Sequence, residues 1–181
     1  MVILNIFFIL IIIAGLVYLY RMNRRRKKFM NISFEESKIS IKRGLNENLF
    51  LRLINSMIKL DFKYFLEFEI TGLDVDNGFK AMSNEERESY VILYQFINNV
   101  KEAKKSIVYV EFITFFVDGS HIITRLNNVR MIMKNDFGYI SKSFYHHLEH
   151  ASQRKDKGIN PVMLNKEEFL SSYLNIFKKQ K

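Results

Sequence analysis

Apolar residues follow one another almost without interruption near the start of the chain. Residues 2–20 read VILNIFFILIIIAGLVYLY, with Asn5 as the strongly polar exception. At 1.5 Å per residue a helix of this length spans about 28 Å, close to the hydrocarbon thickness of a bilayer. Basic residues follow this stretch rather than precede it, and it has no A-x-A-like site, which argues against a cleaved signal peptide. The pattern predicts a transmembrane helix over residues 2–20.

A basic cluster follows this predicted helix directly. Its cations are Arg21, Arg24, Arg25, Arg26, Lys27 and Lys28. The positive-inside rule places this side in the cytosol and the N-terminus outside. The same cations are suited to contact with anionic lipid head groups, and the plainer interpretation is a stop-transfer signal alone. We therefore expect a single-pass protein of the cell membrane, with a basic juxtamembrane linker over residues 21–31 and a cytosolic domain over residues 32–181.

Three segments of that domain have the pattern of β-strands. Alternation of apolar and polar positions predicts strands over residues 32–43 and 62–71, and the polar positions of the second predict a face exposed to water. A β-branched and aromatic run predicts a third strand over residues 107–117. The Asp-Gly pair that follows predicts a hairpin, with its second strand over residues 120–126.

Helices are predicted where apolar residues recur three and four positions apart behind residues suited to N-caps. The predicted helices run from about residue 47 to 60, 83 to 104, 141 to 154 and 165 to 178. The expected caps are Asn46, Ser83, Ser141 and Asn165, with Glu86 and Glu168 completing two capping boxes. Residues 129–134 fit a strand and a helix equally. Because a hairpin interrupts any parallel βαβ series, the order favours an α+β domain with a small, mainly antiparallel sheet covered by helices on one face.

Composition and charge narrow the class of protein. The 181 residues have room for one compact domain beside the anchor, and 48% apolar residues exclude a disordered chain. The sequence has no cysteine, which excludes disulfides and thiolate metal sites. The net charge of +9 lies in the basic cluster and in three lysines among the last four residues, so the segment between them is neutral. A neutral domain argues against nucleic-acid binding, which normally needs a basic patch.

The segment from His146 to His150 carries the clearest candidate chemistry. His146, Glu149 and His150 match H-x-x-E-H, in which two histidines share a metal ion and the glutamate acts as base. Such a hydrolase also needs a third protein ligand and a cleft, and little chain follows the motif. Helical phase places His147 on a packing face with Phe144. The alternative interpretation is structural, with one partly buried histidine and two on a solvated face.

Acidic residues elsewhere offer weaker candidates for metal chemistry. Residues 74–78 resemble the start of a calcium loop, but Phe79 stands where its sharp turn requires glycine. Residues 61–63 and 102–104 have the carboxylate-x-lysine spacing of magnesium nucleases, each without a convincing partner. An acidic turn and exposed side chains are the plainer interpretation of these segments.

The sequence favours a non-enzymatic, membrane-tethered cytosolic domain that binds another protein as a scaffold or accessory subunit, with no cofactor. The alternative is a membrane-tethered metal-dependent hydrolase or nuclease that uses His146, Glu149 and His150, or Asp74 and Asp76. A third hypothesis is weak DNA tethering through residues 21–28, which predicts strongly salt-dependent binding.

Overall fold

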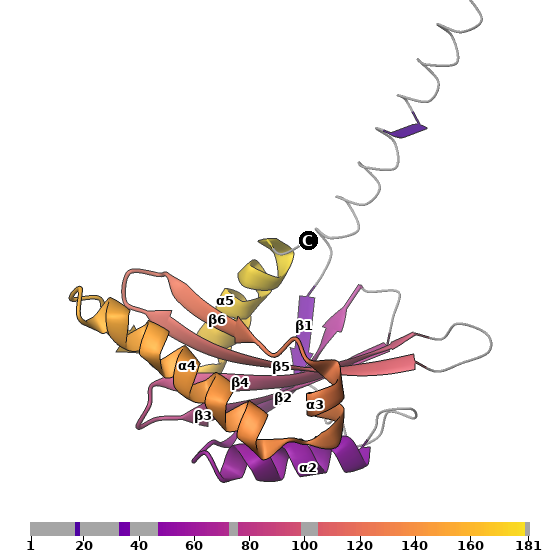
Figure 1. The fold of residues 1–181 in the computed structure, drawn as a ribbon. Helices are drawn as coiled ribbons and strands as arrows, with labels where there is room; N and C mark the ends of the chain where they lie inside the picture. Colours follow the sequence, from indigo (N-terminus) through magenta and orange to yellow (C-terminus); the bar gives the residue numbers. More distant parts are fainter. Residues whose placement is uncertain (1–16, 19–32, 37–46, 73–75, 99–104, 180–181) are drawn as a thin grey trace, which may run out of the picture.

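The computed structural model describes residues 17–18, 33–36, 47–72, 76–98 and 105–179, and within these ranges the chain is α+β (Figure 1). The strands are β1 (Ser33–Glu36), β2 (Lys63–Thr71), β3 (Asp76–Asn84), β4 (Ser89–Asn98), β5 (Lys105–Phe116), β6 (His121–Arg125) and β7 (Pro161–Val162). The helices are α2 (Glu47–Ile58), α3 (Val129–Lys134), α4 (Phe137–Lys155) and α5 (Lys166–Lys179).

All the strands belong to one antiparallel sheet that curves into a half-barrel (Figure 1). Its order is β1-β2-β3-β4-β5-β6, so β2 to β6 form a meander in which each strand pairs with the next along the chain. The short β7 pairs with the end of β5, through Phe115 and Phe116. The prediction of a mainly antiparallel sheet is confirmed.

Helices cover both faces of this sheet, which corrects the prediction of one covered face. Helices α2, α3 and α4 pack on one face against residues such as Val91 and Leu93. Helix α5 packs on the other face, where Tyr90 and Ile92 lie. Consecutive residues of a strand point to opposite faces, so β4 is buried on both and its apolar run is nearly continuous.

The predicted helix over residues 83–104 is wrong in the part that the structure describes. Ser83 belongs to β3, and residues 89–98 form β4, which pairs with β3 over residues 89–97. The side chain of Asn84 shapes the turn between them, since its Oδ1 accepts the Arg87 N–H at 3.0 Å and its Nδ2 donates to the Leu60 carbonyl at 2.9 Å. A strand buried on both faces has apolar residues at helical spacings as well, which explains the error.

The strand predicted over residues 62–71 corresponds to β2, with one irregularity. Leu66, Phe68 and Ile70 are buried as expected. The register against β3 shifts between Tyr64 and Leu66, and Tyr64 is therefore 60% exposed although the alternation placed it in the core. Of the strand predicted over residues 32–43, the structure describes Ser33–Glu36, which form β1. The rest of that segment and the expected cap Asn46 lie outside the described residues.

The hairpin at Asp118-Gly119 is confirmed, with β5 and β6 as its strands. The ambiguous residues 129–134 form α3. The next helix begins at Phe137 rather than near Ser141, because the Asp136 carboxylate accepts the Tyr139 N–H at 2.9 Å and caps it.

The capping box of the last helix is confirmed. The Asn165 Oδ1 accepts the Glu168 N–H at 3.0 Å, and the Glu168 carboxylate accepts the Asn165 N–H at 3.1 Å.

The predicted transmembrane helix lies outside the described residues except for Val17 and Tyr18, whose backbone is helical. Within the described ranges, no helix has the length and apolar character needed to cross a bilayer.

Candidate functional site

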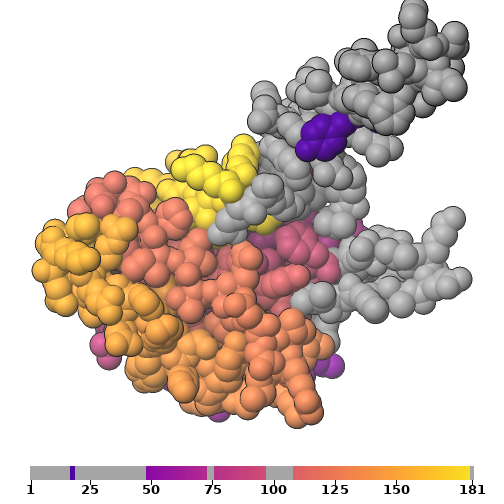
Figure 2. Space-filling view, turned by 45° about the horizontal axis from the view of Figure 1, so that its top comes forward, coloured from indigo at the N-terminus to yellow at the C-terminus, as the bar shows by residue number. Residues whose placement is uncertain are grey.

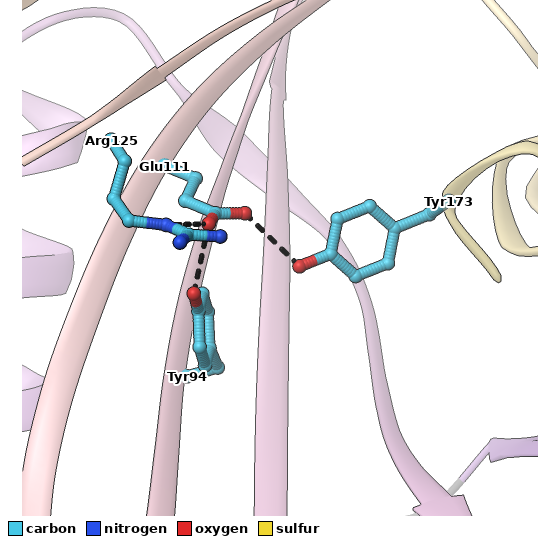
Figure 3. Close-up of polar contacts among 4 residues, drawn as sticks. All are labelled: Tyr94, Glu111, Arg125 and Tyr173. Atoms are coloured by element: carbon cyan, nitrogen blue, oxygen red, sulfur yellow. Dashed lines mark hydrogen bonds and ion pairs between the residues drawn. The ribbon is translucent and has the colours of Figure 1, made fainter. Parts of the chain in front are cut away.

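A buried carboxylate joins the sheet to α5. Glu111 lies in the middle of β5 and is 1% exposed. Its Oε1 accepts hydrogen bonds from the Tyr94 hydroxyl at 2.8 Å and from Nε of Arg125, and its Oε2 accepts one from the Tyr173 hydroxyl at 3.1 Å (Figure 3). We call these four residues the Glu111 cluster. They come from β4, β5, β6 and α5.

Strand geometry brings these side chains together. The period of two along β5 turns Glu111 to the α5 face, with Ile113 and Phe115 on the same side. Glu111 pairs directly with Arg125 in the β5–β6 ladder, where side chains of paired residues are neighbours. Tyr173 reaches the carboxylate from the buried side of α5.

The charges in this cluster are compensated. A buried carboxylate is costly unless it is paired and hydrogen-bonded. Burial, reinforced by the negative charge of Glu111, raises the pKa of both Tyr94 and Tyr173. Both hydroxyls therefore stay protonated near neutral pH and act as donors to the carboxylate. The Arg125 side chain is 43% exposed and supplies the positive charge from the edge of the core. The arrangement positions α5 on the sheet.

No pattern along the chain predicts this cluster, although the sequence carries one signal of it. Glu111 interrupts an otherwise apolar and β-branched run, and a charged residue in such a run is either paired or functional. Its partners lie 17, 14 and 62 residues away along the chain, so no spacing rule connects them.

A second buried polar group, His147, ties α4 to the sheet. Its ring is fully buried, with Nε2 3.0 Å from the Thr114 hydroxyl and Nδ1 3.0 Å from the Thr124 hydroxyl. Burial, together with the neighbouring His150 and His146, lowers the pKa of His147 to about 4. The ring is thus neutral at pH 7 and holds α4 against β5 and β6. Its predicted place on the packing face is confirmed.

The residues of the H-x-x-E-H pattern lie on the outer face of α4. His146 and His150 face one another with their Nε2 atoms 3.1 Å apart. The Glu149 carboxylate lies 3.6 Å from the other ring nitrogen of His146, Nδ1. The structure therefore brings the three side chains together but does not point them at one position. In the described part of the chain, no group of three or more histidine and carboxylate side chains could hold a metal ion. The assignment of His146, Glu149 and His150 as metal ligands stays a prediction.

The structure describes only some of the acidic candidates. Asp74 lies outside the described residues, and Asp76 begins β3. Asn77, from the same suspected loop, is buried, and its side chain accepts the Ile70 N–H at 2.7 Å and donates to the Ile70 carbonyl at 2.9 Å. This residue locks the β2–β3 pair. The 102–104 segment and the basic cluster of residues 21–28 also lie outside the described residues.

Apolar side chains are exposed on the helices that cover one face of the sheet. Between 37% and 58% of each is accessible to solvent. They are Leu51 and Ile58 of α2, Val129 and Met133 of α3, and Phe137 of α4, and we call them the helical apolar surface. The Lys59 ammonium lies 5.6 Å from the Phe137 ring centroid, so the end of α2 adjoins the start of α4. The Ser56 hydroxyl donates to the Asn135 side chain at 3.0 Å and links α2 to the α3–α4 junction.

Comparison of the chain with protein-family models, curated proteins and solved structures found no match. The class that the structure defines is that of an α+β domain, with a curved antiparallel sheet between helices on both faces.

Proposed function

We propose that this chain is a single-pass membrane protein whose C-terminal domain, held at the cytosolic face, binds another protein as a scaffold or accessory subunit. The tether rests on the sequence, namely the apolar residues 2–20 and the cations that follow them. The binding role rests on one observation, the helical apolar surface. Large apolar side chains exposed on neighbouring helices mark a candidate interaction site.

The composition of this surface suits a protein partner. Methionine, aromatic residues and arginine are enriched at protein interfaces, and Met133 and Phe137 supply the first two. Exposed cations neighbour these apolar residues along the chain. They are Arg52 of α2, Lys59 directly after it, and Arg130 and Lys134 of α3. Such a surface fits a partner with an apolar centre and acidic residues around it.

Mild-detergent affinity purification of the tagged full-length chain, with mass spectrometry, tests the proposal. We expect a partner at stoichiometric yield. The paired change Ile58→Glu and Met133→Glu places carboxylates in the helical apolar surface and should abolish recovery of that partner. Val117→Glu is the matched control, because Val117 is also apolar and 65% exposed but lies at the β5–β6 turn. Partner recovery that survives the paired change, with the fold intact by circular dichroism, would refute this surface.

The tether is tested separately by cysteine labelling. Since the native sequence has no cysteine, Lys157→Cys introduces one thiol on the exposed side of the domain. A membrane-impermeant maleimide should label it only after the cells are permeabilised. Deletion of residues 1–20 should release the protein into the soluble fraction and abolish its function. Labelling in intact cells would reverse the orientation, and full function of the truncated chain would eliminate the tether.

A membrane-tethered metal-dependent hydrolase or nuclease is the second proposal, and one observation favours it. The facing Nε2 atoms of His146 and His150, 3.1 Å apart, have a separation suited to two ligands of one metal ion. This function requires stoichiometric zinc in the purified protein and loss of activity on the double change His146→Ala and His150→Ala. A metal-free protein that retains function would eliminate it.

A further inference from the structure

A pocket of about 230 Å³ lies between the turn of the β5–β6 hairpin and the last two turns of α5. The two elements lie side by side at the surface, α5 in yellow and the hairpin in salmon (Figure 2). Helix α5 contributes Ser172, Asn175 and Lys179, whose spacing of three and four residues places them on one face. The hairpin contributes Ser120 and His121.

The remaining wall of the pocket is apolar. Phe115 and Phe116 come from the end of β5, Leu164 precedes α5, and Ile176 lies between the polar residues of α5. Phe115 and Ile176 belong to the core between the sheet and α5, so this wall continues from a well-packed region. An apolar wall with a few polar groups at one side is the usual composition of a small-molecule site.

Basic side chains lie at the polar side of the pocket. His121 and Lys179 line it, and Arg154 of α4 donates to the Ser120 hydroxyl at 3.0 Å. The Asp118 carboxylate lies 3.5 Å from Arg154 and accepts the Ser120 N–H at 2.9 Å. Asp118 is therefore paired with groups of its own turn and of α4. None of the described residues that line the pocket is acidic.

These cations act on the His121 ring. Burial lowers the pKa of His121, and the positive charges of Lys179 and Arg154 lower it further. Asp118 is the nearby acid at the hairpin turn, and its negative charge is paired with the guanidinium of Arg154. An anion between His121 and Lys179 would relieve this repulsion and favour the protonated ring.

We propose that this pocket binds a small carboxylate with an apolar group, whose charge lies between Lys179 and His121 and whose apolar part contacts Phe115 and Ile176. At about 30 Å³ per water molecule, the volume equals that of roughly eight waters, which suits a small aromatic carboxylate. The apolar wall favours a carboxylate over inorganic phosphate, because phosphate leaves that wall without a contact. This site shares no residue with the helical apolar surface or with the proposed metal ligands His146 and His150, so it does not depend on either proposed function.

Titration calorimetry on the purified full-length chain in mild detergent tests this site. The probes are benzoate, its neutral analogue benzamide, and inorganic phosphate. We expect saturable binding of benzoate, at least tenfold tighter than that of either other probe, because only benzoate uses both the cations and the apolar wall. Binding should tighten from pH 7.5 to pH 6, since His121 gains its proton as the pH falls.

Two variants separate the site from general charge effects. Lys179→Met keeps the length of the side chain and removes its charge, and should weaken benzoate binding about tenfold, as expected for the loss of one charge-assisted contact. Lys178→Met is the matched control, because Lys178 is exposed on the same turn of α5 but does not line the pocket, and it should change the affinity less than twofold. Equal affinity for benzoate and benzamide, no saturable binding, or an unchanged affinity in Lys179→Met would overturn the proposal. Tighter binding of phosphate would overturn the carboxylate assignment.

Discussion

Acid should destabilise this domain through one side chain, His147. In the folded state the ring is fully buried between the Thr114 and Thr124 hydroxyls and its pKa is lowered to about 4. In the unfolded chain the pKa of histidine is about 6.5. Between these two values the unfolded chain binds a proton that the folded domain does not bind. Stability from this group is thus complete above about pH 6.5 and is lost as the pH falls through about 4.

The size of this effect follows from the difference between the two pKa values. A difference of about 2.5 units corresponds to about 3.5 kcal/mol, at roughly 1.4 kcal/mol per unit, and about 3 kcal/mol of this is lost between pH 7 and pH 4. This is a large share of the roughly 5–15 kcal/mol that stabilises a typical domain. The ring has no exposed surface, so water does not offset the cost of placing a charge on it, which causes the pKa shift.

The assay is urea unfolding of the full-length chain in mild detergent at pH 7 and pH 4, followed by near-ultraviolet circular dichroism of its tyrosines. His147→Gln removes the titrating group and keeps a donor and an acceptor for the two threonines. The wild type should lose about 3 kcal/mol more free energy of unfolding than this variant over that pH change. Gln153→Ala, at an exposed position of the same helix, is the control and should behave as the wild type. An equal loss in the wild type and in His147→Gln would refute the reasoning.

Further predictions concern the Glu111 cluster and the α5 cap. Glu111→Gln should lower the free energy of unfolding by about 2 kcal/mol, because it removes the buried charge that Arg125 compensates, whereas the exposed change Glu149→Gln should alter it by less than about 0.5 kcal/mol. Tyr173→Phe should cost about 1 kcal/mol and loosen α5, seen as faster amide hydrogen exchange in that helix than in α4. Asn165→Ala should cost about 1 kcal/mol through loss of the capping box, with Asn175→Ala on the same helix as its control. Urea unfolding measures each cost, and an unchanged midpoint in Glu111→Gln would show that this carboxylate contributes nothing to stability.

The elements that the sequence predicted well are those with short-range chemistry. The Asp118-Gly119 turn is closed by a left-handed Gly119, with φ of 77°, and by the Asp118 side chain, which accepts the Ser120 N–H. The Asn165 and Glu168 box likewise needs only residues three positions apart. Such interactions are complete within a few residues, so the pattern alone identifies them.

The wrong predictions concern segments in which local patterns fit more than one structure. Strand β4 is apolar at nearly every position because helices cover both faces of the sheet, and a continuous apolar run fits the spacing of a helix as well as that of a strand. The predicted start of α4 was wrong because Asp136, and not Ser141, is its N-cap. The αL residue Asn135 ends α3 directly before it, so the new helix begins at once.

Local sequence patterns predict several features of this domain correctly: the hairpin, the cap of α5, the strand β2 and the packing face that holds His147. Tertiary packing places helices on both faces of the sheet, brings Tyr94, Arg125 and Tyr173 to Glu111, and places His121 and Lys179 in one pocket. These groups come from strands and helices far apart in the chain. Their proximity depends on strand register and on the packing of whole elements, which no short-range pattern records.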